Sequence, residues 1–392
     1  MRPLDGITVV SLEQAVAAPF ATRHLADLGA RVIKIERPET GDFARAYDET
    51  VRGMSASFVW LNRSKESLTL NLKHQRSREI MMRLISRADV FVQNLAPGAA
   101  ERLGLSFDVL IARFPRLVVC DISGYGDSGP YRDKKAYDLL IQAEAGLISI
   151  TGSPEGPAKT GISVADICAG MYAYSGILAA LLQRERTGKG TRIEVSMFEA
   201  LCEWMLFPLY YANLGGIPYS RSGAHHAAIV PYGPYRTSDG NTVMIGIQNE
   251  REWMSFCERV LALPDLACDL RFNSNSRRVA NREALGSIIE PILRTLGGNQ
   301  LLELLDAIGI ASSRMNNLQD VWNHSQLSAR ERWRNFDSPV GQVAGLVPPG
   351  LPQGVEPRFD PVPALGAHVD TVLAELGYSR KDMDQLRNEQ VI

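Results

Sequence analysis

Residues 7–38 read ITVVSLEQAVAAPFATRHLADLGARVIKIERP, and this stretch decides the fold class. It begins with a short apolar run, continues through a segment with helical spacing that ends at Gly29, and closes with a second apolar run that Pro38 stops. A strand, a helix and a second strand in this order predict a right-handed crossover between parallel strands.

The same alternation continues through the first third of the chain. Further short strands are predicted at 67–72, 89–94 and 117–122, and apolar residues at helical spacing predict a helix over 75–88. Strands that alternate with helices form a parallel sheet covered on both faces, and ligands gather at the carboxyl ends of its strands. The segment DLGARVIKIE lacks the GxGxxG fingerprint, which argues against a bound dinucleotide.

A chain of 392 residues is too long for one ordinary core, so we expect an α/β large domain and a second, smaller α+β domain. The turn at 238–240 lies between two apolar runs and predicts a hairpin in the smaller domain. Segments rich in Pro and Gly mark the linkers. The expected boundaries are a large domain over 1–200, a linker over 201–224, a small domain over 225–325, a second linker over 326–350, and a C-terminal segment over 351–392 that packs back on the large domain.

Composition excludes several classes of function. A net charge of −2 gives no general attraction to nucleic acid or to anionic membranes. The amino terminus lacks the apolar core of a signal peptide, and the longest apolar run, 167–182, is short for a membrane span. Five scattered cysteines without CxxC spacing indicate a reducing compartment, so we expect a cytoplasmic protein; no metal-binding spacing is present, and we expect no metal.

A single acid, Asp166, stands at the head of the apolar segment 161–182. One interpretation is an ordinary acid in the first turn of a helix, where negative charge is favourable. The other is a chemical role, because Ser163 is available as the cap and the helix behind Asp166 is predicted to be buried on all sides. Partial burial would raise the pKa of Asp166 and the helix terminus would lower it. If the second effect dominates, the result is an ionised, poorly hydrated carboxylate suited to attack on an activated carbonyl.

Seven stretches, in order along nearly the whole chain, together resemble the class III CoA-transferases, the CaiB/BaiF family that includes formyl-CoA transferase. Each stretch alone is a weak signal, but the set is specific. The stretches are PLDGITVV, HLADLGARVIKIERP, NRSKESLTLNLK, NLAPGAAERLG, GYGDSGPY, VADICAGMYAYSGILAALLQRERTGKGTRIEVSMFEA and LGAHVDTVLAELG.

The resemblance implies a Rossmann-like large domain, a small domain, and two subunits interlocked as a homodimer. It implies that Asp166 is the nucleophile, with coenzyme A as a substrate and no prosthetic group. The diphosphate and ribose phosphate of CoA need Arg and Lys side chains, although each one alone is more often an ordinary surface charge. The positions that match the family's CoA contacts are Ala15, Val16, Arg37, Leu70, Lys73, Asn94, Leu95, Arg102, Lys135 and Tyr137.

The implied reaction moves CoA from an acyl-CoA donor to a small carboxylic acid through an aspartyl anhydride and an aspartyl-CoA thioester. The chain looks most similar to members that act on dicarboxylyl thioesters such as mesaconyl-, itaconyl- or succinyl-CoA. The alternative is a racemase or isomerase that exchanges the α-proton of an acyl-CoA. Related racemases place a histidine where Tyr137 stands, and tyrosine is a poor base at neutral pH, which favours transfer. A non-catalytic CoA-binding protein is a third possibility.

One stretch departs from the family pattern. Some transferases have a run of glycines that closes over the aspartate, whereas this chain has Gly223 followed by His225 and His226. These residues are candidates for the acyl pocket, and solvent-exposed linker histidines are an equal alternative. Arg45, Arg52 and Arg221 are further candidates to pair with a second carboxylate on the acyl group.

Overall fold

The computed structural model describes residues 1–216 and 219–392. The chain divides into two compact units. The large unit comprises 1–145, 161–206 and 327–392, and the small unit comprises 146–160 and 207–326. The boundaries therefore differ from the expected ones, because 146–160 and 207–224 cluster with the small unit.

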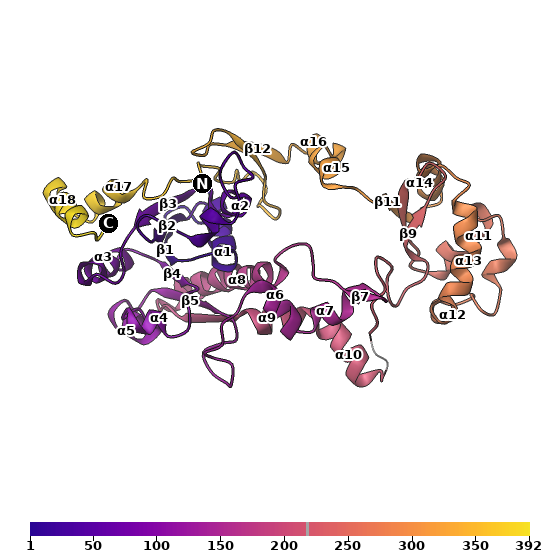
Figure 1. Cartoon of the computed structure of the whole chain (residues 1–392), viewed down its shortest axis with the longest axis horizontal. Helices are drawn as coiled ribbons and strands as arrows, with labels where there is room; N and C mark the ends of the chain where they lie inside the picture. The colour runs from indigo at the N-terminus through magenta and orange to yellow at the C-terminus, as the bar shows by residue number, and fades with distance from the viewer. Residues whose placement is uncertain (217–218) are drawn as a thin grey trace. The chain divides into compact units, whose positions relative to one another are not determined.

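A six-stranded parallel sheet forms the centre of the large unit, in the order β3-β2-β1-β4-β5-β8 (Figure 1). This confirms the predicted α/β class. The chain order reverses between β1 and β4, so the crevice at their carboxyl ends is the topological switch point at which ligands bind in such folds. The strands are β1 (Thr8–Leu12), β2 (Arg31–Glu36), β3 (Lys65–Thr69), β4 (Val90–Gln93), β5 (Val118–Ser123) and β8 (Arg192–Ser196).

Helices cover both faces of this sheet (Figure 1). One face carries α1 (Ala17–Asp27) and α8 (Val164–Thr187), which pack against each other. The other face buries Val10, Ile33 and Phe91 against α3 (Gln75–Ile85), α5 (Phe107–Arg113), α17 (Val369–Glu375) and α18 (Arg380–Asn388). The strands are buried on both faces for this reason, and they bury polar side chains as well, such as Lys34 of β2 and Lys65 of β3.

Helix α8 packs unusually close to α1. A Cβ at Gly170 would lie 2.7 Å from the carbonyl oxygen of Ala17, so glycine is needed at this contact. The expectation that this helix is buried on all sides is wrong for the single chain, because Met171, Tyr172 and Leu182 are 38%, 37% and 58% exposed. By length and composition alone α8 could cross a bilayer, although 44% of its most apolar window is buried inside the protein.

The small unit has its own core and an antiparallel sheet in the order β11-β10-β9, which confirms the predicted smaller α+β domain. Strands β9 (Tyr232–Arg236) and β10 (Thr242–Gly246) form the predicted hairpin, and β11 (Ala311–Arg314) pairs with β10. Apolar side chains of the sheet pack against α11 (Glu250–Arg259), α13 (Arg282–Leu293) and α14 (Gly298–Ala307). Smaller elements of this unit are α7 (Leu147–Ile150), β6 (Gly152–Ser153), β7 (Gly156–Pro157), η2 (Pro264–Ala267), α12 (Asn275–Ala280) and α15 (Leu318–Trp322).

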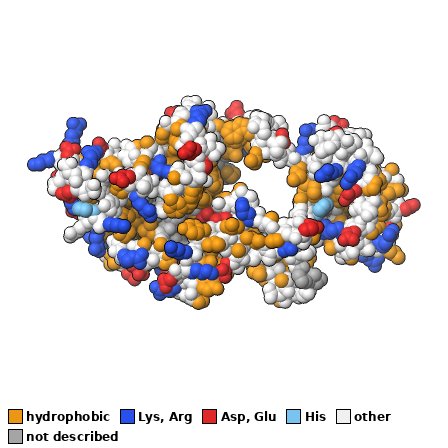
Figure 2. Space-filling model, in the orientation of Figure 1, with side chains coloured by type: hydrophobic (Ala, Val, Ile, Leu, Met, Phe, Trp, Pro, Cys, Tyr) orange, Lys and Arg blue, Asp and Glu red, His pale blue; other side chains and the backbone are white. Residues whose placement is uncertain are grey.

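The segment expected to be a linker at 326–350 contains a hairpin of β12 (Trp333–Phe336) and β13 (Val343–Leu346). Phe336 packs against Phe58 and Val362 in a satellite core of the large unit, so this segment is structured. The remaining elements are η1 (Phe43–Ala46), α2 (Ala56–Asn62), α4 (Ala99–Arg102), α6 (Asp138–Glu144), α9 (Met197–Trp204), α10 (Leu206–Leu214) and α16 (Ser325–Ala329). Figure 2 shows hydrophobic side chains, in orange, interspersed with charges on the exposed surface of both units.

Candidate active site

Asp166 lies in the first turn of α8 and is partly buried. Ser163 occupies the N-cap position, but its side chain makes no capping hydrogen bond. Asp138, at the start of α6, caps the helix instead: one of its carboxylate oxygens accepts from the N–H of Ala165 at 2.8 Å and of Asp166 at 3.2 Å. The capping task falls to another acid, so the side chain of Asp166 is free for other contacts.

The electrostatics of Asp166 differ from the sequence-based expectation. Burial, with a smaller contribution from the charge of Asp138, raises the pKa of Asp166 to about 7, and the backbone N–H of Ala17 opposes this rise. No Lys or Arg side chain in the part of the chain that the structure describes forms an ion pair with Asp166. Desolvation therefore dominates over the helix terminus, and the carboxylate is only partly ionised at neutral pH.

The loop after β1 brings backbone to this acid. Ala15 has a left-handed backbone (φ +62°), and its N–H donates to Asp42 at 3.1 Å. Two residues later, the N–H of Ala17 hydrogen-bonds to the side chain of Asp166. Asn94, after β4, holds the same loop through two hydrogen bonds with the backbone of Gln14, at 2.8 and 2.9 Å. The predicted residues Ala15, Asn94 and Asp166 thus meet at the switch point of the sheet.

Fully buried charges anchor this loop from behind. Lys34 donates to Asp42 at 2.6 Å, and Lys65 donates to Glu13 at 2.6 Å. The side chains of all four residues are 0% exposed. Burial alone would raise the pKa of Glu13, but Lys65 and Lys34 outweigh burial and lower it. The network fixes both ends of the loop, because Glu13 begins it and Asp42 accepts from Ala15.

Two tyrosines lie near the acid. Burial, followed by the charges of Asp42 and Asp166, raises the pKa of Tyr47 to about 12, and Tyr137 adds to this shift. Tyr137, at the start of α6, is 64% exposed and so accessible to a ligand. Sequence reasoning missed Tyr47 and Asp138. Asp138 directly follows the predicted Tyr137, but it hydrogen-bonds to the start of α8, which is distant in sequence. No local sequence pattern marks such a contact.

Four predicted basic residues follow four strands of the parallel sheet, two on each side of β1. Arg37, Lys73, Arg102 and Lys135 come after β2, β3, β4 and β5 respectively, and all four are exposed. Within residues 1–216 and 219–392, none of them has a carboxylate partner, whereas Arg31, Arg63 and Arg192 are paired. Unpaired cations at the carboxyl edge of a parallel sheet form a suitable site for a polyanion.

The apolar positions predicted to contact CoA are placed less favourably. The side chain of Leu70 is 1% exposed and belongs to the core behind the sheet, so only its backbone is available. Val16 is 6% exposed and packs with Phe20 and Leu61. Leu95 is half-buried, and its N–H donates to the side chain of Gln93 at 2.7 Å.

The arginines suggested for the acyl pocket have other partners. Arg45 makes a bidentate ion pair with Glu36, with both hydrogen bonds at 2.8 Å, and its guanidinium lies over the ring of Phe58. Arg52 donates to the backbone carbonyls of Val340 and Gln342. Arg221 lies in the small unit and donates to backbone carbonyls there.

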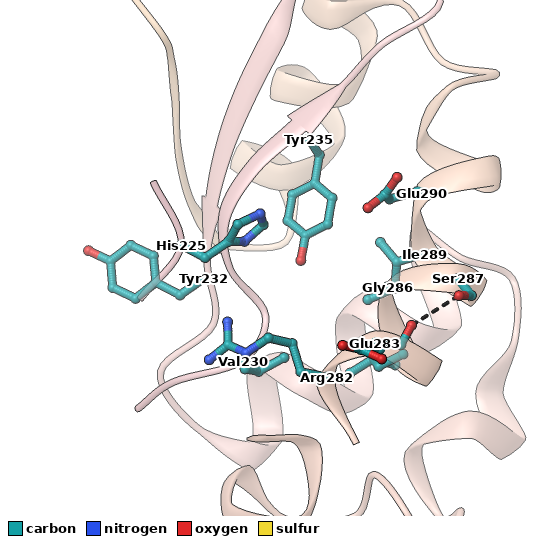
Figure 3. A pocket seen from close by; sticks show the side chains of 11 residues that line it. His225, Val230, Tyr232, Tyr235, Arg282, Glu283, Gly286, Ser287, Ile289 and Glu290 are labelled. Carbon is teal, nitrogen blue, oxygen red and sulfur yellow. Dashed lines mark hydrogen bonds between the residues drawn. The ribbon is translucent and has the colours of Figure 1, made fainter. Parts of the chain in front are cut away.

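Gly223, His225 and His226 also belong to the small unit. The ring of His226 stacks on Tyr232 with centroids 5.2 Å apart. His225 lines a cavity of about 310 Å³ between β9 and α13 (Figure 3). Among the described residues, no three His, Cys, Asp or Glu side chains gather closely enough to hold a metal ion.

Comparison with known proteins identifies the family of this chain. A sequence profile described as CoA-transferase family III matches residues 4–369, nearly the whole chain. The chain belongs to CoA-transferase family III. The family includes the CaiB/BaiF proteins, as the resemblance implied, and the protein is an enzyme of the CoA-transferase class that uses acyl-CoA as a substrate.

Relatives and a solved structure agree with this assignment. The chain is 34% identical to succinyl-CoA:glutarate CoA-transferase of Mus musculus, over 100% of this chain and 91% of the relative. It is also 34% identical to acetyl-CoA:oxalate CoA-transferase of Acetobacter aceti, over 93% and 92%. The crystal structure of a CAIB/BAIF family protein from Brucella suis superposes with a TM-score of 0.84 at 35% identity, covering 96% of this chain and 99% of that one.

Proposed function

We propose that this CoA-transferase moves CoA between small carboxylic acids through covalent intermediates on Asp166. The observation that carries the proposal is the placement of this acid: it is partly buried, has no ion-pair partner among the described residues, and accepts a hydrogen bond from Ala17 at the switch point of the sheet. A nucleophile needs this combination of access, fixed geometry and incomplete stabilisation of its charge.

The steps balance as follows. The carboxylate of Asp166 attacks the thioester carbon of the donor acyl-CoA, which forms a mixed anhydride and releases CoA thiolate. The thiolate attacks the aspartyl carbonyl, giving an aspartyl-CoA thioester and the free donor acid. The acceptor carboxylate attacks that thioester to form a second anhydride. The thiolate then attacks the acceptor carbonyl, and Asp166 regains its carboxylate.

Burial favours these intermediates over the resting carboxylate. Burial and Asp138 both penalise negative charge on Asp166. The anhydride and the thioester are neutral at that position, so acylation removes the penalised charge. The N–H of Ala17 points at the carboxylate and is placed to stabilise the oxyanion that forms during attack, an interaction typically worth about 3 kcal/mol.

The four exposed cations Arg37, Lys73, Arg102 and Lys135 are proposed to hold the phosphates of CoA while its thiol is free between steps. For the acceptor, we propose a small dicarboxylic acid. This rests on the relatives, whose names specify glutarate and oxalate. Because Arg45 is paired with Glu36, we do not assign it to the second carboxylate of the acceptor.

One observation also fits α-proton exchange. A carboxyl group with a pKa of about 7 is a suitable general base near neutral pH. A two-base mechanism needs a second base. Related racemases have a histidine for this purpose, and the exposed Tyr137 stands at that position in this chain. Incorporation of deuterium at the α-carbon from heavy water, without an acceptor acid, would support exchange; its absence during active transfer would exclude it.

We further propose that the enzyme is a homodimer. Each unit supports this by itself: Met171, Tyr172 and Leu182 of α8 are exposed on the large unit, and Phe207 and Tyr210 of α10 are exposed on the small unit. Exposed apolar side chains of this kind usually lie in interfaces. The molar mass in solution, measured by light scattering, tests it, and a monomer at micromolar concentration would reject it.

Trapping tests the covalent proposal. The enzyme is incubated with succinyl-CoA, treated with hydroxylamine, digested and analysed by peptide mass spectrometry. We expect a hydroxamate on Asp166 and none on Asp138. An unmodified Asp166 during active transfer would reject the mechanism.

A further inference from the structure

The small unit contains a cavity that the transfer mechanism does not use. It has a volume of about 310 Å³ and lies between strand β9 and helix α13 (Figure 3). Three polar groups line it: His225 from the loop before β9, Tyr235 from β9, and Arg282 from α13. The charge on Arg282 influences the protonation of both His225 and Tyr235, so the three groups are close to one another.

Tyr235 presents its hydroxyl to the cavity. The residue is 7% exposed, and Figure 3 shows its hydroxyl directed into the cavity. No hydrogen-bond partner for this hydroxyl is present in the part of the chain that the structure describes. The hydroxyl opens on the cavity, so it is available to donate a hydrogen bond to a group that enters there.

Arg282 also lacks a partner for its charge among the described residues. One of its terminal nitrogens donates to the carbonyls of His226 and Ala227, both at 2.8 Å, but none of the described residues forms an ion pair with it. Burial lowers the pKa of Arg282, and Tyr235 opposes this shift. Arg278, in the preceding helix α12, is the contrast: it is 1% exposed and makes two hydrogen bonds to Glu250, at 2.6 and 3.0 Å.

His225 completes one end of the cavity as a neutral group. Burial and the charge on Arg282 lower its pKa, so it offers a hydrogen-bonding ring without a second positive charge. Its ring stands edge-on to that of Tyr235, with centroids 6.1 Å apart. Gly233 makes this position possible, because a Cβ there would lie 2.2 Å from Nδ1 of His225.

Two acids, Glu283 and Glu290, line the cavity from α13 on its exposed side. The cavity therefore has a cation with an unpaired hydroxyl in its interior and negative charge at its margin. We propose that it binds a small zwitterionic acid, whose carboxylate pairs with Arg282 and Tyr235 and whose ammonium group faces Glu283 and Glu290. Bidentate Arg–carboxylate pairing supplies the strongest contact. The rim acids select against a second carboxylate, which distinguishes this site from one for a dicarboxylic substrate.

Isothermal titration calorimetry on the full-length protein tests this, with 5-aminopentanoate, pentanoate and glutarate as probes. We expect saturable binding of 5-aminopentanoate that Arg282→Gln weakens at least about tenfold and Tyr235→Phe about three- to tenfold. Glu290→Gln weakens 5-aminopentanoate but strengthens glutarate. The matched control Arg277→Gln, on a neighbouring exposed arginine outside the cavity, leaves all affinities unchanged.

The variants also guard against misfolding. Tyr235→Phe removes one oxygen that has no partner, so the folded protein keeps its unfolding temperature. Failure of all three probes to bind would overturn the proposal, as would equal affinities in Arg282→Gln and Arg277→Gln. If glutarate binds most tightly and Glu290→Gln does not change the order, the site is not one for a zwitterion and the proposal is wrong.

Discussion

Glu13 and Asp166 are acids of the large unit that both lie at the loop after β1. Glu13 begins this loop, and the N–H of Ala17, four residues later, hydrogen-bonds to Asp166. The surroundings of the two acids nevertheless differ. Glu13 is fully buried with Lys65 at 2.6 Å and Lys34 at 3.5 Å, and these cations hold its pKa below the usual value despite burial. Asp166 is less buried and faces a second acid, Asp138, and its pKa rises to about 7. Neighbouring cations therefore decide the state of a buried acid more than the depth of burial does.

The comparison separates two tasks. The paired region, Glu13, Lys34, Asp42 and Lys65, fixes the loop at the end of β1 and contributes rigidity. The unpaired acid keeps its charge poorly stabilised, which suits it to form a neutral covalent intermediate. Active sites commonly retain such destabilising groups, and the rest of the fold offsets their cost.

The largest expected effect is on activity. Asp166→Asn retains the shape of the side chain but removes the proposed nucleophile, and we expect CoA transfer to fall by at least about a thousandfold. The rate of acyl-CoA exchange, measured by chromatography, checks this. Asp133→Asn, on an exposed acid paired only with Arg132, is the control and should keep the native rate. A native rate of CoA transfer by Asp166→Asn would contradict the catalytic role proposed for Asp166.

The next effect is on stability. Lys34→Met leaves Asp42 and Glu13 without one of their buried cations, and removal of one partner from a buried pair typically costs about 3–5 kcal/mol. Urea denaturation gives the free energy of unfolding. Lys189→Met, at an exposed position, should change it by less than about 0.5 kcal/mol. Equal effects of the two substitutions would show that the buried network is not what anchors the loop.

Asp166→Asn should stabilise the protein at pH 8. An acid whose pKa is higher in the folded state than in the unfolded state binds more protons when folded, so stability falls as pH rises between the two values. The native enzyme therefore loses stability between about pH 4 and pH 7, and Asp166→Asn does not. We expect a gain of about 1–3 kcal/mol at pH 8 and little difference at pH 4. Thermal unfolding at both pH values measures it.

The smallest effect concerns Asp138. The carboxylate of Asp138 raises the pKa of Asp166, while its oxygen caps α8. Asp138→Asn keeps an oxygen for the cap and removes the like charge, so the pH profile of acyl-enzyme formation moves to lower pH. The rate of hydroxylamine-sensitive labelling from pH 5 to 9 is the readout. An unchanged or upward-shifted profile would contradict the role given to Asp138.

Local pattern predicted the fold better than the site. The strands at β1, β2, β4 and β5 follow from short apolar runs between helical segments, because a doubly covered parallel sheet leaves that pattern. The hairpin of β12 and β13 was missed, since neighbouring Pro and Gly residues indicated a linker. The sequence predicted that α8 is buried on all sides, and this is wrong for the single chain. Apolar residues all around a helix do not show which of them face the core of the same chain.

The resemblance predicts Asp166 and the exposed cations after the strands as site residues, and these roles stay predictions. It could not show that the guanidinium of Arg45 is paired with Glu36, or that Leu70 points into the core. Asp138 and Tyr47 act through space on a residue distant in sequence, so no spacing rule marks them. The raised pKa of Asp166 follows from neighbours that only the fold assembles.

Oxygen transfer to the enzyme tests the central claim most directly. In the proposed mechanism, one carboxylate oxygen of the acceptor acid bridges the second anhydride and remains on Asp166 when the acceptor leaves as its CoA thioester. Turnover with an acceptor labelled with ¹⁸O in its carboxylates, followed by peptide mass spectrometry, should place ¹⁸O on Asp166 and none on Asp138. Many turnovers without ¹⁸O in the Asp166 carboxylate would contradict the account.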